Sequence, residues 1–375
     1  MRAFWVVLFW LCAGTIAYVY LGYPAIMALW AKLRPRRYTQ DDHRPSLTVI
    51  IAAHNEAACI TQKLQNTLSL AYPADKLRVI VVADGSDDGT EQLAERGRDP
   101  RVQVLYQPER QGKAAALSRA VAAASSELLI FTDANAMLAP DALKSLVRPL
   151  ADPHIAAVGG AKRTPQGGES LYWRYENALK RWESAVGSVM GVPGELWAVR
   201  ASLYQPPPSD TILDDWTASM GLVAQGWRVV HAPEAIAYEE PPTNLRAAWE
   251  RRARNAAGGW QAIVRLGGPA RYADLLTWWQ CFSHRILRWM VVPWLWLPLL
   301  VASIALARHL LYLAAALAQW ILYDLAVMGA ILAVYDKTVP WLTAPFYLLF
   351  GNAAAAAGGW RYLTRKQTVL WRKAR

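Results

Sequence analysis

The stretch LLIFTDAN, residues 128–135, decides the fold of this 375-residue chain. Its four leading apolar residues are typical of a strand that is buried on both faces of a parallel sheet. The stretch ends in a carboxylate and an amide, Asp133 and Asn135. Ligands of open α/β sheets bind at the carboxyl ends of strands, and two oxygen donors at this spacing can hold a divalent cation. A strand followed by an ordinary Asx turn is the alternative, so the neighbouring stretches have to decide.

Three further apolar runs predict strands on the amino-terminal side, at residues 47–53, 77–83 and 102–106. Helical patterns cover residues 56–70 and 111–124. Strands that alternate with helices of this length indicate an α/β domain with a parallel sheet between helical layers. No G-x-G-x-x-G motif follows the first strand, which disfavours a membrane dehydrogenase that binds a dinucleotide.

Polar residues follow the first strands where each run ends. His54, Asn55 and Glu56 come after the first strand, and Asp84 closes the second. The Asp84 carboxylate can accept hydrogen bonds from a nucleotide base or ribose; an acidic turn before a helix is the alternative. Lys113 follows a glycine at the start of a helix, which suits an anion but is also a common position for a surface lysine.

Charged pairs follow in the second half of the domain. Asp214 and Asp215 begin a helix, where one acid can cap while the other points into a cleft. A desolvated carboxylate beside another acid gains proton affinity, which suits a general base; an acidic helix start favoured by the dipole is the alternative. Arg251 and Arg254 share a helix face and offer planar donors to a diphosphate, unless this face is simply solvated.

Long apolar stretches lie near both ends of the chain. Residues 3–31 contain no charge and are long enough to cross a bilayer, and basic residues at 32–37 place the following domain in the cytoplasm by the positive-inside bias. Residues 270–288 mix aromatic and charged side chains, as in an interfacial helix. Candidate crossings follow at 289–307, 310–335 and 338–360. Four crossings from an outside amino terminus would leave the basic residues after 360 outside, contrary to the same bias, and the sequence leaves this conflict open.

We therefore divide the chain into five parts: an anchor with its basic flank (1–37), a cytoplasmic catalytic domain (38–267), an interfacial helix (268–288), two to three transmembrane helices (289–360) and a basic tail (361–375). The net charge of +11 suits an anionic membrane surface or phosphate-bearing substrates. No nucleic-acid-binding signature is present, so nucleic acid is not an expected partner. The 3 cysteines form no metal-binding spacing and no disulfide framework.

In this order and spacing, the motifs resemble those of family 2 glycosyltransferases, over nearly the whole chain. The nearest resemblance is to membrane-anchored bacterial members related to cellulose, hyaluronan and poly-N-acetylglucosamine synthases. The motifs that carry it are His54-Asn55-Glu56, Asp84 to Thr90, Gly112-Lys113, Asp133-Ala134-Asn135, Asp214-Asp215 and Arg251 to Arg254.

The resemblance implies a GT-A fold, a nucleotide-sugar-binding domain with a Rossmann-like mixed sheet, together with an N-terminal transmembrane helix and a C-terminal helical membrane region. It implies that Asp215 is the general base, with Asp214 beside it, and that Asp133 and Asn135 hold Mg²⁺ or Mn²⁺. Glu195 would lie where relatives bind the acceptor. The donor-binding residues implied are His54, Asn55, Glu56, Asp84, Lys113, Asp133, Arg251 and Arg254.

Three positions depart from the family pattern. Asn135 stands where a second acid is usual, Arg251 where Gln is usual, and Asn255 where the Trp of the Gln-x-x-Arg-Trp motif is usual. That Trp belongs to the acceptor channel of processive synthases, so its absence disfavours polymer synthesis.

We expect an inverting glycosyltransferase, a hexosyltransferase that moves a sugar from a nucleotide-diphosphate donor, preferably a UDP-sugar, to a lipid-linked or polysaccharide acceptor. It would be a multi-pass protein of the cell membrane, working at the cytoplasmic face in contact with membrane lipids. One alternative is a processive exopolysaccharide synthase with a partner channel for export. Another is a membrane subunit that binds a nucleotide sugar without catalysis.

Overall fold

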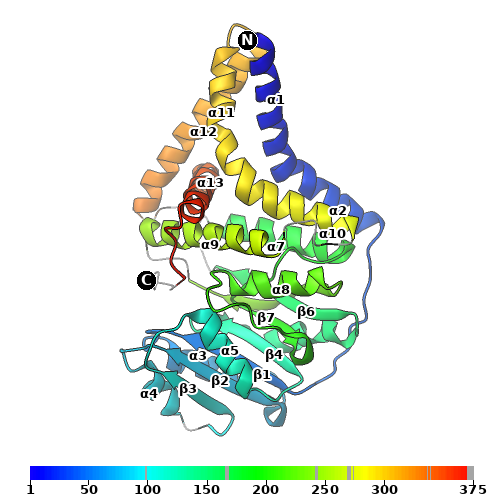
Figure 1. Ribbon diagram of the computed structural model, residues 1–375, viewed down its shortest axis with the longest axis vertical. Coiled ribbons are helices and arrows are strands. Elements are labelled where there is room, and N and C mark those ends of the chain that lie inside the picture. The colour runs from blue at the N-terminus through cyan, green and yellow to red at the C-terminus, as the bar shows by residue number, and fades with distance from the viewer. Residues whose placement is uncertain are drawn as a thin grey trace.

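The computed structural model describes residues 1–97, 99–164, 169–240, 244–267, 272, 274–335, 337 and 339–369. An α/β body forms the lower part of the molecule in Figure 1, and long helices from both ends of the chain extend from it. The predicted domain boundary at residue 268 and residues 370–375 of the predicted tail lie outside the described residues.

A mixed sheet of eight strands, in the order β3-β2-β1-β4-β7-β6-β8-β5, forms the centre of the body. Its parallel half was predicted: β1 (Leu47–Ala53), β2 (Leu77–Asp84), β3 (Val102–Gln107) and β4 (Leu128–Asp133). In the register, Ala52 lies opposite Asp133 and Ala53 lies opposite Ala83. The polar residues that follow β1, β2 and β4 are therefore gathered at one edge of the sheet, as expected for a parallel arrangement.

The other half of the sheet changes strand direction. β7 (Trp197–Arg200) runs antiparallel to both β4 and β6 (Ile155–Arg163). β8 (Arg228–Tyr238) runs parallel to β6, and the short β5 (Met137–Leu138) returns along β8. Because β5 follows β4 in the chain and pairs with the end of β8, the residues after Tyr238 lie close to the residues that follow β4.

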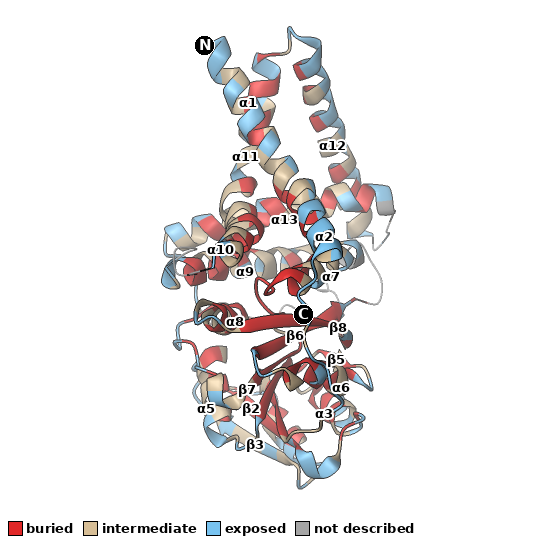
Figure 2. Cartoon of the chain, turned by 90° about the vertical axis from the view of Figure 1, so that its right-hand side faces the viewer, coloured by how far each residue is buried: buried red, intermediate tan, exposed pale blue. Residues whose placement is uncertain are grey.

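Helices cover both faces of the sheet, and its central strands are almost completely buried, whereas the edge strand β3 is partly exposed (Figure 2). One face packs against α3 (Ile60–Leu68), α4 (Thr90–Glu95) and α6 (Ala142–Val147). The other face packs against α5 (Lys113–Ala123), α8 (Asp214–Ala224) and the carboxyl-terminal part of α9 (Leu245–Arg265). The prediction of a helix from Glu56 was wrong at its start, because Asn55 has a φ of 57° and the chain turns there before α3 begins.

Among the described residues, three helical segments are long and apolar enough to cross a membrane: Arg2–Leu33, Leu275–Ala305 and Leu310–Val334. The first consists of α1 (Arg2–Ala17), a π-helical turn and α2 (Tyr23–Leu33). The second consists of α10 (Leu275–Cys281), a π-helical stretch (Phe282–Val291) and α11 (Val292–Ala305), and the third is α12 (Leu310–Val334). The predicted interfacial helix and the crossing that follows it are therefore one continuous bent segment.

The first apolar segment bends between α1 and α2. A π-helical turn, Tyr18–Gly22, precedes Pro24. Proline has no N–H to donate to the carbonyl four residues earlier, and the Tyr20 carbonyl instead accepts a hydrogen bond from the Tyr175 hydroxyl at 3.3 Å. The bend thereby directs α2 along α7 (Glu169–Val186), a helix of the α/β body.

The last helix, α13 (Pro340–Leu363), is not among the three apolar segments and packs against α9. A Cβ added at Gly358 would lie 2.2 Å from the Ala253 carbonyl oxygen, so only glycine permits this approach of the two backbones. The alanine- and glycine-rich composition of α13, which corresponds to the candidate crossing at 338–360, thus permits its close contact with α9.

Candidate active site

A cavity of about 1770 Å³ lies between the polar edge of the sheet and the helices that lead to the apolar segments. All of the predicted site residues line it except Asn55 and Asp84. Those that do are His54, Glu56, Lys113, Asp133, Asn135, Glu195, Asp214, Asp215, Arg251 and Arg254.

Asn55 and Asp84 support the wall of the cavity from behind. Asp84 is fully buried, and its carboxylate accepts hydrogen bonds from the Gly112 N–H at 2.7 Å and from the Arg119 guanidinium at 2.8 Å. It therefore fixes the glycine turn that precedes Lys113, where Gly112 has a φ of 98°. Asn55 accepts a hydrogen bond from the Asp87 N–H at 3.0 Å and joins the loops that follow β1 and β2.

Lys113 connects the acids of the site. It is the first residue of α5, and its Nζ lies 2.9 Å from Asp133 Oδ1 and 3.8 Å from Asp214 Oδ2. Burial would lower the pKa of Lys113, but the carboxylates of Asp133, Asp214 and Asp215 outweigh it and raise the pKa. The lysine therefore remains an ammonium ion, which draws the end of β4 and the start of α8 together.

The Asp215 carboxylate has a raised proton affinity. Burial and the neighbouring Asp214 raise the pKa of Asp215 to about 7, against the opposing effect of Lys113. Its Oδ1 accepts a hydrogen bond from the Trp216 N–H at 2.7 Å. A Cβ added at Gly194 would lie 2.9 Å from Asp215 Oδ2, so the glycine leaves the space that this oxygen occupies. A carboxylate with a pKa near neutrality is suited to general-base catalysis.

A buried network of charges lies on the far side of Asn135. The Asn135 amide donates to Glu239 Oε1 at 2.8 Å, and the Arg251 guanidinium contacts both oxygens of the same carboxylate at 2.9 Å. Lys162 joins Glu239 to Glu195, with its Nζ 2.6 Å from Glu195 Oε1. Burial would raise the pKa of Glu239, but Arg251 and Lys162 hold it well below its usual range.

This network gives a physical reason for one departure from the family pattern. Two acids, Glu195 and Glu239, are neutralised by two cations, and the second cation is Arg251 at the position where Gln is usual. The Arg251 guanidinium therefore contacts carboxylates in this structure, and it holds the region around Asn135 in place. Lys162 and Glu239 were missed by the sequence analysis, because each is a single charge at the end of an apolar strand and has meaning only beside the other.

Arg254 presents donors that protein groups do not fully use. Its Nη2 donates to the Ile212 carbonyl at 3.2 Å and to the Val369 carbonyl at 3.4 Å, both at the limit of a hydrogen bond. Its Nε is buried and has no partner among the residues that the structure describes. An incompletely satisfied guanidinium in a cavity suits an anionic ligand.

The oxygen donors at the end of β4 are suited to a cation that keeps other ligands. No group of three or more His, Cys, Asp or Glu side chains that could hold a metal is present in the described part of the chain. Mg²⁺ and related ions commonly take only one or two protein oxygens together with water and substrate phosphates. Asp133 and Asn135 meet that requirement, because Lys113 contacts only Oδ1 of Asp133 and the contact of Asn135 with Glu239 uses its amide nitrogen.

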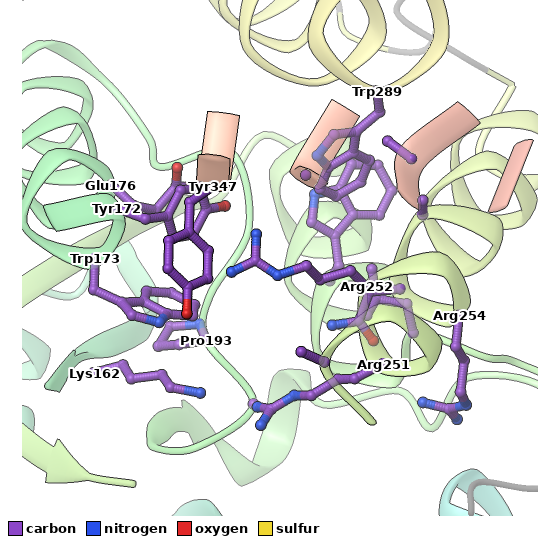
Figure 3. A pocket seen from close by; sticks show the side chains of 18 of the residues that line it. Lys162, Tyr172, Trp173, Glu176, Pro193, Arg251, Arg252, Arg254, Trp289 and Tyr347 are labelled. Atoms are coloured by element: carbon purple, nitrogen blue, oxygen red, sulfur yellow. The ribbon is translucent and has the colours of Figure 1, made fainter. Parts of the chain in front are cut away.

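The cavity continues from Asp215 toward the apolar segments. In Figure 3, Arg251, Arg252 and Arg254 enter from α9 on one side, and Tyr172 and Glu176 of α7 face them together with Tyr347 of α13. The Arg252 guanidinium lies over the rings of Tyr172 and Tyr347, at 5.5 and 5.3 Å from their centroids. This part of the wall is thus built from charged and aromatic side chains that are far apart in the sequence.

Comparisons with known proteins give consistent matches. The model of glycosyl transferase family 2 matches residues 48–204, and that of glycosyl transferase family group 2 matches residues 128–350. Poly-beta-1,6-N-acetyl-D-glucosamine synthase of Staphylococcus aureus (strain COL) is 27% identical over 236 residues, which is 60% of this chain and 57% of the relative. The probable glycosyltransferase YdaM of Bacillus subtilis (strain 168) is 26% identical over 59% of this chain and 57% of its own. The match thus spans little more than half the length of these relatives.

One solved structure resembles the whole chain. The mannosyltransferase PcManGT from Pyrobaculum calidifontis, determined in complex with GDP-Man and Mn²⁺, has a TM-score of 0.76 and a sequence identity of 28%. The likeness covers 98% of this chain and 99% of that chain, so it includes the apolar helices as well as the α/β body.

Proposed function

The chain belongs to glycosyl transferase family group 2, and on that premise we propose that it is an inverting hexosyltransferase at the membrane surface. Its membership makes it a glycosyltransferase with a GT-A fold, so these two predictions from the sequence are confirmed. The observation that carries the proposal is that Asp215, Asp133 and Lys113 meet in one cavity whose wall continues into apolar helices.

In the proposed reaction, Asp215 removes the proton from an acceptor hydroxyl. The acceptor oxygen then forms a bond to the anomeric carbon of the donor sugar, while the bond from that carbon to the diphosphate breaks on the opposite face. The nucleoside diphosphate departs with the bonding electrons, and the sugar is transferred with inversion. A general base contributes roughly 10²- to 10⁴-fold to such a step.

In this proposal, cations of the site offset the charge on the leaving diphosphate. Lys113 and Arg254 are cations beside the acids of the site, and Arg254 has an unused donor among the described residues. Preorganised cations of this kind lower the cost of charge that develops during transfer. Asp133 and Asn135 would hold Mg²⁺ or Mn²⁺, which would supply further positive charge at the diphosphate.

Two kinds of nucleotide sugar are candidates for the donor. The sequence resemblance favours a UDP-sugar, and Asp84 would act on the base through the loop that it supports. GDP-mannose is the second candidate, because the mannosyltransferase that resembles the whole chain was solved with that donor. A processive exopolysaccharide synthase with an export partner is the second candidate function, favoured by the similarity to poly-N-acetylglucosamine synthase.

We also propose three crossings, with the catalytic body in the cytoplasm. Arg2–Leu33, Leu275–Ala305 and Leu310–Val334 would cross, while α13 lies against α9. Arg361, in the last turn of α13, forms an ion pair with Glu250 of α9 at 2.6 Å. Both basic regions then lie on the side of the catalytic body, which removes the conflict with the positive-inside bias that four crossings create.

The test is release of nucleoside diphosphate by the purified full chain in nanodiscs. UDP-glucose, UDP-N-acetylglucosamine and GDP-mannose are supplied with Mg²⁺, with Mn²⁺ and with a chelator. We expect one donor to be cleaved with a divalent cation and not with the chelator. Binding of a donor without any release would favour a non-catalytic subunit instead.

A further inference from the structure

Lys180 of α7 is a buried lysine that the proposed reaction does not use. It is 5% exposed, and it lines the same cavity as Asp215. Among the residues that the structure describes, no hydrogen bond or ion pair reaches its ammonium group. Burial is the main cause that lowers the pKa of Lys180, and the surrounding acids offset it only in part. A buried cation without a partner is costly, so an anionic ligand would stabilise it.

The acids nearest to Lys180 along its helix are occupied by other groups. Glu176, one turn earlier, contacts Arg288 at 2.9 Å and His284 at 3.3 Å. Glu183, three residues later, accepts hydrogen bonds from the Tyr23 hydroxyl at 2.5 Å and from His284 at 2.7 Å. These contacts fasten α7 to the apolar segments, and they leave the charge of Lys180 for a ligand in the cavity.

Apolar side chains from the long helices line the same cavity as Lys180. Ile16, Ala17 and Leu21 come from the first apolar segment, Leu299 from the second, and Leu348 and Ala355 from α13, together with charged side chains such as Arg252. The cavity therefore combines the proposed general base, a buried cation without a protein partner among the described residues, and side chains of helices that are apolar enough to cross a membrane. A ligand that matches this combination has a polar acceptor group, an anion and a hydrocarbon chain.

We propose that the acceptor is a sugar carried on a lipid phosphate, with its phosphate at Lys180 and its hydrocarbon chain along the apolar wall. This inference rests on the proposed function, because the sugar hydroxyl must reach Asp215. That hydroxyl loses its proton to the Asp215 carboxylate, its oxygen bonds to the anomeric carbon of the donor, and the nucleoside diphosphate leaves. The lipid phosphate is not broken, and it serves only as the anchor.

Binding of simple probes to the full chain in phosphatidylcholine nanodiscs tests the anchor without knowledge of the acceptor sugar. The probes are farnesyl phosphate, farnesol and inorganic phosphate. We expect farnesyl phosphate to bind at least tenfold more tightly than the other two. Lys180→Met should lose this preference by about tenfold or more, the scale of a lost charge-assisted hydrogen bond, and Lys180→Arg should keep most of it. Lys144→Met, at a partly exposed lysine of α6, is the matched control and should change nothing.

Binding of UDP and GDP to the same proteins separates this inference from the proposed function. Lys180→Met should bind the nucleoside diphosphate as the unchanged protein does, which also reports that it is folded. Equal affinity for farnesol and farnesyl phosphate, equal affinity for inorganic phosphate, or an unchanged Lys180→Met would each overturn the lipid-phosphate anchor. If the unchanged protein bound neither UDP nor GDP, the proposed function would be overturned instead.

Discussion

The two halves of the cavity are built in different ways. The donor half consists of residues that follow β1 and β4, Lys113 at the start of α5, and Asp214 and Asp215 at the start of α8. The membrane half consists of α7, the π-helical stretch of the second apolar segment, α9 and α13. Short polar loops make the first, whereas long-range buried ion pairs such as Glu176–Arg288 make the second.

The charged side chains of the two halves therefore have different expected roles. On the proposed function, a group in the donor half acts directly on substrate, so its replacement should remove turnover and leave the fold intact. A group in the buried networks neutralises other charges, so its replacement should leave an unpaired charge and unfold the protein before it reveals any catalytic role. Five predictions test this separation, in order of decreasing effect.

Asp215→Asn should lower turnover by roughly 10²- to 10⁴-fold, because an amide cannot accept the proton of the acceptor. Donor affinity should stay within a few-fold of normal, and the far-UV CD spectrum should not change. Asp141→Asn, at an exposed acid of α6, is the control and should be fully active. Near-normal turnover of Asp215→Asn would remove this residue from the role of general base and would break the distinction for the donor half.

Arg251→Gln restores the usual family residue and should still destabilise this chain. It leaves Glu195 and Glu239 with Lys162 as their cation in the network, and loss of one partner from a buried ionic group costs about 3–5 kcal/mol. Chemical denaturation in detergent measures the loss. Arg246→Gln, at an exposed arginine on the same helix, should have no effect. Normal stability with lost donor binding would instead make Arg251 a diphosphate ligand, as the sequence first suggested.

The pH dependence should follow Asp215. Its carboxyl must be ionised to act as a base, and its pKa is raised to about 7. The rate under kcat/KM conditions should therefore fall about tenfold for each unit below pH 7 and level off above it. A limb centred near pH 4 would contradict the raised pKa.

Stability should respond to the same group in the opposite sense. The pKa in the folded chain lies above the value of the unfolded chain, so the folded state binds more protons between them, and stability falls as the pH rises through this interval. Asp215→Asn should therefore raise Tm at pH 8 and have no effect at pH 4. Thermal melts of both proteins across this range provide the measurement.

Asn135→Asp should have the smallest effect, because Asn135 lies where the two kinds of region meet. The substitution replaces a donor to Glu239 by a second carboxylate. Without a divalent cation it should cost about 1–3 kcal/mol, and Mn²⁺ should restore the loss because the new acid is a better ligand. Asn66→Asp is the control: Asn66 donates to the Leu138 carbonyl, lies outside the cavity lining, and should lose stability with or without Mn²⁺. Equal rescue of both variants would exclude a metal site at Asn135.

The sequence alone predicted the parallel half of the sheet and the apolar segments. Apolar runs fix strands, parallel strands end at one edge of a sheet, and uncharged stretches longer than a bilayer is thick have few other environments. These patterns are local, so Asp133, Lys113 and the first apolar segment could be identified from the order of residues.

Tertiary structure alone decided which charges meet. Whether Asp84 lines the cavity or supports it, and whether Arg251 faces a diphosphate or two carboxylates, depend on partners that lie 12 to 56 residues away in the chain. In the sequence, Lys180 is an ordinary lysine of an amphipathic helix. In the structure it is unpaired among the described residues, because Glu176 and Glu183 contact side chains of other segments. The physical reason is that the energy of a buried charge is set by the partners that surround it in space, and spacing along the chain does not encode them.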